Sequence, residues 1–161
     1  MKHNRGFTIV ELLIYSAILV AFLYIMTNIF TETLDMQLES ETASAVSQDS
    51  RYILSRLSYD IARASSITQP ASLGQQTSSL VLRIGPATYT YALSNGNLLL
   101  TDPIETGALN SYGSTVSNLT FRRYGNVNGK PSVRLTFTLA SVAQRTSGAQ
   151  SEDFEATYGT R

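Results

Sequence analysis

The 161-residue chain contains no cysteine and a single histidine, His3. Without cysteine it can form no disulfide framework and no thiolate metal site. A chain that began after Gly6 would have neither residue type. That excludes Ser-His-Asp and Cys-His nucleophilic catalysis and the usual zinc sites. Only carboxylate, lysine or tyrosine chemistry would remain for an enzyme, and the missing residue types argue against the alternative of an anchored hydrolase. We therefore expect a protein that is not an enzyme, with no catalytic residue, no metal and no cofactor.

An excess of charge of either sign is also missing. The 12 basic and 12 acidic residues give a formal net charge of +0. Loss of the first six residues would remove Lys2 and Arg5 and leave the chain slightly acidic. This balance gives no global reason to expect nucleic acid as a partner.

Charge is scarcest near the N-terminus. Residues 7–30 are almost entirely apolar and carry one charge, Glu11. At 1.5 Å per residue this run spans roughly 36 Å, enough for a tilted crossing of a ~30 Å hydrocarbon core. Lys2 and Arg5 precede it and would stay cytoplasmic, which places the rest of the chain outside. Because a carboxylate in lipid is costly, Glu11 is a candidate functional residue.

Two common kinds of N-terminal segment are alternative interpretations of residues 7–30. A secretory signal peptide has an apolar core of about 7–15 residues followed by a small-residue cleavage site. Residues 7–30 are longer than that, and no clear Ala-x-Ala site with a polar flank follows them. A plain signal anchor fits the length and the topology but gives no reason for Glu11.

The start of the chain, Gly6-Phe7-Thr8-Ile9-Val10-Glu11-Leu12-Leu13, resembles the class III signal of type IV pilins and type II secretion pseudopilins. The resemblance implies that residues 1–6 are a leader, that a prepilin peptidase cleaves after Gly6, and that the new N-terminal Phe7 is N-methylated. It also implies a role for Glu11 in assembly. The implied partners are other pilin or pseudopilin subunits, the prepilin peptidase and an inner-membrane assembly platform.

The physical chemistry of the segment agrees with that role. After cleavage, Phe7 would carry an α-amine with an ordinary pKa of about 7.7–8.0, so it would be largely cationic at neutral pH. Glu11 in lipid costs on the order of 3 kcal/mol unless it is neutralised or paired. A neighbouring subunit's Phe7 amine can pair with Glu11 and fix the axial register of a filament.

Glycine and proline are absent from Thr31 to Ile67. Apolar residues recur there mostly at three- or four-residue steps, which predicts an amphipathic helix. We expect one helix from about Phe7 to about Ser66, in which the amphipathic segment 31–66 continues the apolar segment 7–30. Acidic side chains between positions 32 and 49 are followed by Arg51, Arg56 and Arg63. These charged side chains form either a solvated helix face with weak ion pairs or a surface complementary to the helix of a neighbouring subunit.

Residues 67–161 change to a period of two. Strands are expected around Leu80–Ile84 and Tyr89–Leu93, with a type I′ hairpin at Asn95-Gly96 and a return strand at Asn97–Thr101. Further strands are expected at Val116–Tyr124, Ser132–Val142 and Asp153–Tyr158. The intervening segments Thr68–Thr77, Asp102–Thr115 and Ala143–Ser151 are expected to be turns and loops. The fold class is α+β and pilin-like: a long N-terminal helix, transmembrane in its first half, packed on an antiparallel β-sheet head with one covered face.

The rest of the chain refines the resemblance. The helical stretch Arg51–Ala64 and the hairpin Tyr91-Ala92-Leu93-Ser94-Asn95-Gly96-Asn97-Leu98 are similar to segments of J-type minor pseudopilins and W-type minor pilins. So is the ending Phe154–Arg161. These similarities favour a minor subunit that lies at the tip of the filament or takes part in initiating its assembly. Before assembly the subunit would lie in the cytoplasmic membrane with its head outside, and after assembly it would be part of the filament. The alternative is a tip-displayed adhesion or DNA-uptake subunit of a competence-type pilus.

Four smaller groups are weighed beside this hypothesis. Arg122-Arg123-Tyr124 could contact DNA, but two arginines on opposite faces of a strand are a small footprint. Asp102 and Glu105 could bind Ca²⁺, which wants six to eight oxygens, so a plain turn is favoured. Asn118-Leu119-Thr120 matches the glycosylation sequon but falls in an expected strand. Glu152 and Asp153 fall in an expected polar loop without an acid-base partner.

Overall fold

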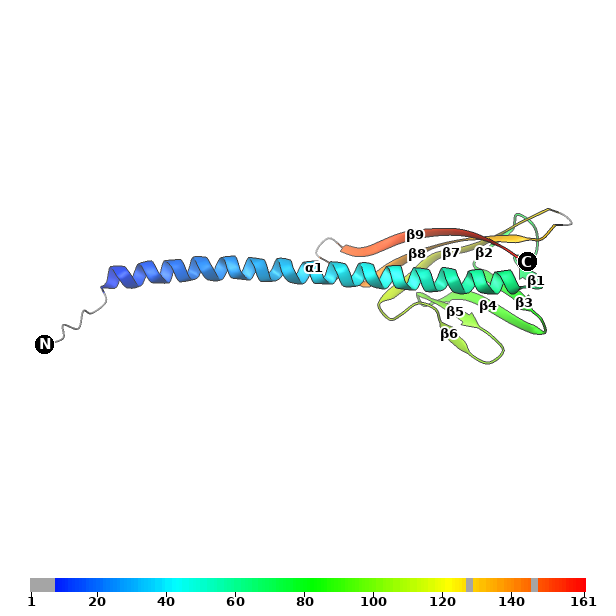
Figure 1. Cartoon of the computed structure of the whole chain (residues 1–161), viewed down its shortest axis with the longest axis horizontal. Coiled ribbons are helices and arrows are strands. Elements are labelled where there is room, and N and C mark those ends of the chain that lie inside the picture. Colours follow the sequence, from blue (N-terminus) through cyan, green and yellow to red (C-terminus); the bar gives the residue numbers. More distant parts are fainter. Residues whose placement is uncertain (1–7, 127–128, 146–147) are drawn as a thin grey trace. The chain divides into compact units, whose positions relative to one another are not determined.

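The computed structural model describes residues 8–126, 129–145 and 148–161, without the side chains of residues 144 and 145. Along the chain the elements are one helix followed by strands (Figure 1). Their bounds are α1 Ile9–Arg63, β1 Ser66–Gln69, β2 Gln76–Thr77, β3 Ser79–Ile84, β4 Ala87–Ser94, β5 Asn97–Thr101, β6 Thr106–Ala108, β7 Ser114–Tyr124, β8 Ser132–Arg145 and β9 Gly148–Gly159. The described chain divides after Leu38 into two compact units, the first holding the apolar half of α1 and the second everything from Glu39 onward.

Helix α1 begins at an N-cap. The Thr8 side-chain oxygen accepts a hydrogen bond from the Glu11 N–H at 3.2 Å, and the Thr8 carbonyl accepts one from the Leu12 N–H at 3.2 Å. Such a cap satisfies donors that the first turn leaves without an intrahelical partner. The long helix expected from sequence is therefore present, with Phe7 outside the described residues.

The helix ends at Arg63, three residues earlier than the expected Ser66. Sheet pairing ends it: the N–H and the hydroxyl of Ser65 both donate to the Arg83 carbonyl at 2.8 Å, and Ser66 pairs with Arg83. A pattern of apolar residues cannot locate this end, because the competing hydrogen bonds come from a strand almost twenty residues away.

Within the second unit, one face of α1 is buried. Val46, Ile53, Leu57 and Ile61 are at most 1% exposed and belong to the same hydrophobic core as residues of the strands. Their successive spacings of seven, four and four residues are those of a single helical stripe. The amphipathic pattern of this part of the helix is confirmed.

The strands form two antiparallel sheets, where one was expected from sequence. The first sheet has the order β1-β3-β4-β5-β6 and the second β2-β7-β8-β9. The chain changes sheets between Thr77, which pairs with Phe121, and Ser79, which pairs with Ala92. Figure 1 shows β7, β8 and β9 on one side of the second half of α1 and β3 to β6 on the other. Apolar alternation specifies one buried face for each strand but does not specify its partner, which is why the single-sheet prediction is wrong.

The hairpin between β4 and β5 is as expected. Asn95 and Gly96 have φ values of 49° and 76°, both positive as a type I′ turn requires, and Ser94 pairs with Asn97. Burial along β8 also follows the expected alternation: Val133, Leu135, Phe137 and Leu139 are at most 2% exposed. These side chains give the second sheet its core-facing surface.

Three segments expected to be turns or loops hold strands. Thr68–Thr77 contains the end of β1 and all of β2, and Asp102–Thr115 contains β6 and the start of β7. In place of the loop Ala143–Ser151, β8 continues to Arg145 and β9 starts at Gly148, with Gln144 paired with Ala149. Residues 148, 149, 151, 152 and 153 are exposed, so no apolar residue on a buried face marks this part of the hairpin.

Candidate membrane-embedded assembly segment

The apolar half of α1 is the strongest candidate for function. Every side chain from Leu12 to Phe30 is exposed, including the bulky residues Ile18, Phe22 and Ile25 at more than half of their surface. In the part of the chain that the structure describes, α1 is the one helix long and apolar enough to cross a membrane. Water solvates such a surface poorly, so we expect this surface to contact lipid or other helices.

Glu11 lies in the first turn of this segment and is partly shielded, whereas its neighbours along the span are exposed. Its Oε1 accepts a hydrogen bond from the Tyr15 hydroxyl at 3.3 Å. The free N–H groups and positive dipole end of a helix N-terminus favour an anion there. The structure thus places the carboxylate predicted for assembly at the start of the exposed apolar helix.

The other predicted site residues lie beyond what the structure describes. Gly6 and Phe7 fall outside the described residues, as do Lys2 and Arg5. Cleavage after Gly6 and N-methylation of Phe7 stay predictions from the sequence.

A buried polar cluster in the head was not foreseen. Asp60 is 1% exposed, its Oδ2 lies 2.9 Å from Arg56 Nε, and the same oxygen accepts a hydrogen bond from the Tyr91 hydroxyl. Burial, together with the Asp60 carboxylate, raises the pKa of Tyr91 above its ordinary value, so the phenol stays protonated. Asp60 Oδ1 is buried without a hydrogen-bond partner. The cluster ties α1 to β4, and the only sequence signal for it is the four-residue spacing of Arg56 and Asp60.

Asp49 also belongs to the head and not to a freely solvated acidic face. Its Oδ2 accepts hydrogen bonds from the Ser111 N–H at 2.9 Å, the Ser111 hydroxyl at 2.8 Å and the Ser114 hydroxyl at 2.5 Å. This carboxylate fastens α1 to the segment that leads into β7.

We expect Asp49→Ala to destabilise the head by about 1–3 kcal/mol, because it leaves three donors without their acceptor. Thermal unfolding of the detergent-solubilised chain measures this. Gln48→Ala, a neighbouring change on an exposed side chain whose one hydrogen bond goes to Ser44 within the helix, is the control. An Asp49→Ala protein as stable as the control would contradict the fastening role.

The basic-aromatic cluster at the end of β7 is divided between two faces, as expected. Arg123 Nη1 donates to the carbonyls of Ile67, Pro70 and Ala71 at 3.0, 3.2 and 2.8 Å. Arg122 is exposed and lies 5.3 Å from the centre of the Tyr124 ring. Arg123 is therefore occupied in holding the β1–β2 connection, and it offers little to a phosphate.

Asp102 closes a turn. Its Oδ1 accepts the N–H groups of Ile104 at 2.8 Å and Glu105 at 2.9 Å, and these bonds lower its pKa below the ordinary value. Within the described residues there is no group of three or more His, Cys, Asp or Glu side chains that could hold a metal ion. The hydrogen bonds fit the plain turn favoured from sequence.

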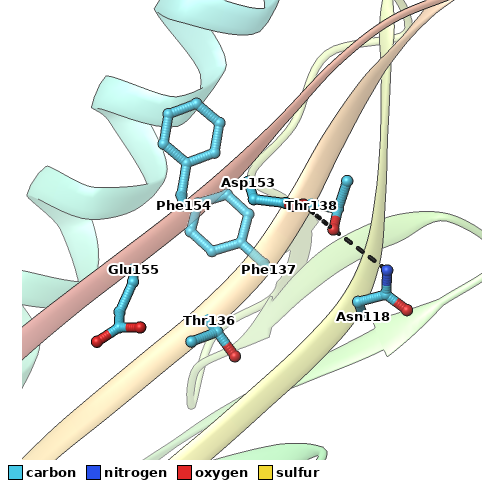
Figure 2. A pocket seen from close by; sticks show the side chains of 7 residues that line it. All are labelled: Asn118, Thr136, Phe137, Thr138, Asp153, Phe154 and Glu155. Atoms are coloured by element: carbon cyan, nitrogen blue, oxygen red, sulfur yellow. Dashed lines mark hydrogen bonds between the residues drawn. The ribbon is translucent and has the colours of Figure 1, made fainter.

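A cavity of about 330 Å³ lies against β7, β8 and β9 (Figure 2). There Asn118 Nδ2 donates to the Thr138 hydroxyl at 3.2 Å, which donates to Asp153 Oδ1 at 2.6 Å. Asn118 is in a strand, as expected, at a register shift and with a φ of 52°. Glu152 and Asp153 lie in β9. This agrees with the strand expected from Asp153 onward, and the placement of the pair in a polar loop is wrong. Glu155 also lines the cavity, and its Oε1 lies 3.3 Å from Arg134 Nε.

No protein-family model, curated protein sequence or solved structure matches the chain. The fold is therefore described by its own geometry: a long apolar N-terminal helix whose second part packs with antiparallel sheets.

Proposed function

We propose that the chain is a minor subunit of a type IV pilus-like or type II secretion filament. In this proposal it is inserted as a single-pass precursor in the cytoplasmic membrane, with the N-terminus cytoplasmic and the head outside. The prepilin peptidase cleaves after Gly6, Phe7 is N-methylated, and the apolar helix leaves the lipid to join the filament. The role is structural and non-enzymatic.

One observation carries the proposal: α1 joins an exposed apolar half, with Glu11 in its first turn, to an amphipathic half that has one face buried in a folded head. A membrane anchor accounts for the exposed apolar half of the helix, and packing in the head accounts for the buried stripe. Neither the anchor nor the head accounts for the Glu11 carboxylate, which lipid disfavours. A neighbouring subunit's cationic Phe7 amine would supply its partner, and this links the membrane segment to assembly.

The same account gives the partners. The apolar surface of residues 12–30 would pack against the corresponding helices of other pilin or pseudopilin subunits. The inner-membrane assembly platform and the prepilin peptidase would act on the membrane-inserted precursor. The alternative of a tip-displayed DNA-uptake subunit is weakened at Arg123, which is already bound to three carbonyls.

Processing is the direct test. In cells that contain a prepilin peptidase, we expect the membrane-extracted protein to begin at N-methylated Phe7 and to lack the mass of residues 1–6. N-terminal sequencing and intact mass spectrometry measure both. Gly6→Val, which places a branched side chain at the cleavage position, is the control and should keep the full-length mass. A wild-type chain that still begins at Met1 would overturn the proposal.

A further inference from the structure

Tyr15 lies one helical turn after Glu11 and donates its hydroxyl hydrogen to Glu11 Oε1 at 3.3 Å. Residues four apart lie on the same helix face, so this contact needs no change in the backbone. Within the described residues it is the one hydrogen bond that the Glu11 carboxylate makes, and Oε2 is left for another donor.

The direction of this hydrogen bond is informative. Thr8-Ile9-Val10-Glu11 has the spacing of a capping box, in which the glutamate reaches back to the N–H of the capping residue. Thr8 makes its half of the box by accepting the Glu11 N–H at 3.2 Å. Across residues 8–126 and the later described ranges, the reciprocal bond from the Thr8 N–H to Glu11 is absent. The carboxylate points forward to Tyr15 and away from its own helix end.

We infer that Tyr15 is a positioning residue for Glu11, and this inference rests on the proposed function. Its hydroxyl holds one carboxylate oxygen away from the helix terminus and leaves the other to accept the α-amine of a second pilin-like subunit. In hydrocarbon no water can solvate the carboxylate, so a donor within the subunit also lowers the cost of keeping it there before assembly.

The same apolar segment offers a matched control. Tyr24 is 69% exposed, and its hydroxyl has no hydrogen bond to any described residue. Tyr15→Phe and Tyr24→Phe therefore remove the same atom from the same helix, but only the first removes a contact to Glu11.

The contact itself is tested before assembly. The ring carbon that bears the hydroxyl has a ¹³C shift that responds to hydrogen bonding of the phenol. In full-length tyrosine-labelled protein in detergent micelles, Glu11→Leu should move the signal assigned to Tyr15 and leave that of Tyr24 in place. A Tyr15 signal that does not respond to Glu11→Leu would overturn the inference without touching the proposed function.

The role is tested by incorporation into a cross-linked filament in cells that carry the assembly machinery. Hydrogen bonds between side chains within membranes have modest strength, so Tyr15→Phe should lower incorporation about threefold. Tyr24→Phe should match the wild type. In the Glu11→Leu background, Tyr15→Phe should cause no further loss, because its effect runs through Glu11.

Other outcomes separate the two ideas. Wild-type incorporation of Tyr15→Phe beside a defective Glu11→Leu would overturn the positioning role alone. An equal loss from Tyr15→Phe with and without Glu11 would overturn it as well, since Tyr15 would then act by packing. Wild-type incorporation of Glu11→Leu would overturn the assembly role of Glu11 and with it the function of the contact.

Discussion

A Glu11→Gln subunit should insert into the membrane normally and enter the filament at least about tenfold less than the wild type. The change keeps the size of the side chain and removes only its charge. A carboxylate in lipid costs on the order of 3 kcal/mol, which pairing with a neighbour's α-amine would offset. The amide loses the attraction to that cation, so assembly becomes weaker, while insertion is not impaired because no charge has to enter the lipid. A tenfold loss corresponds to about 1.4 kcal/mol, well within the range of a charge-assisted contact.

Two measurements separate these effects. Carbonate extraction measures membrane insertion, and cross-linking of intact cells measures the fraction of the subunit within filaments. Glu32→Gln, a change of the same chemistry on an exposed helix position just beyond the apolar run, is the control and should behave as the wild type. Glu11→Gln incorporation equal to that of Glu32→Gln would remove the assembly role from Glu11.

The parts of the fold that were foreseen depend on local patterns. Absence of glycine and proline over residues 31–67 predicts an uninterrupted helix, and α1 runs from Ile9 to Arg63. The Asn95-Gly96 pair predicts its turn because both residues tolerate positive φ. Glu11 was recognised for the same reason, since a lone charge in an apolar run is visible without any tertiary structure.

The parts that were missed depend on partners far apart in the sequence. Which strands share a sheet is decided by pairing, as when Thr77 joins Phe121 while Ser79 joins Ala92. The end of β8 and the start of β9 are held by their cross-strand hydrogen bonds and show little apolar alternation. The Glu11–Tyr15 contact was missed for another reason: its four-residue spacing permits it, but only side-chain positions reveal it.

The head supplies the second large effect: Asp60→Ala should destabilise it by about 3 kcal/mol and lower its Tm by roughly 6–12 °C. Asp60 is 1% exposed and binds both Arg56 and Tyr91 through Oδ2. Removing it leaves a partly buried guanidinium and a buried phenol without their acceptor, together with the cavity of the lost carboxyl group. Unfolding of the detergent-solubilised chain, followed by near-UV circular dichroism of its tyrosines, measures the loss.

Two variants show whether the unpaired polar groups cause that loss. Glu152→Ala removes an exposed carboxylate from β9 and should change stability by no more than about 0.5 kcal/mol. The triple variant Arg56→Met, Asp60→Leu and Tyr91→Phe removes all three polar ends together. It should recover most of the stability, because apolar residues of similar volume often replace a buried ion pair without loss. If the triple variant is as unstable as Asp60→Ala, shape at the junction of α1 and β4 decides the loss, and the explanation by unpaired polar groups is wrong.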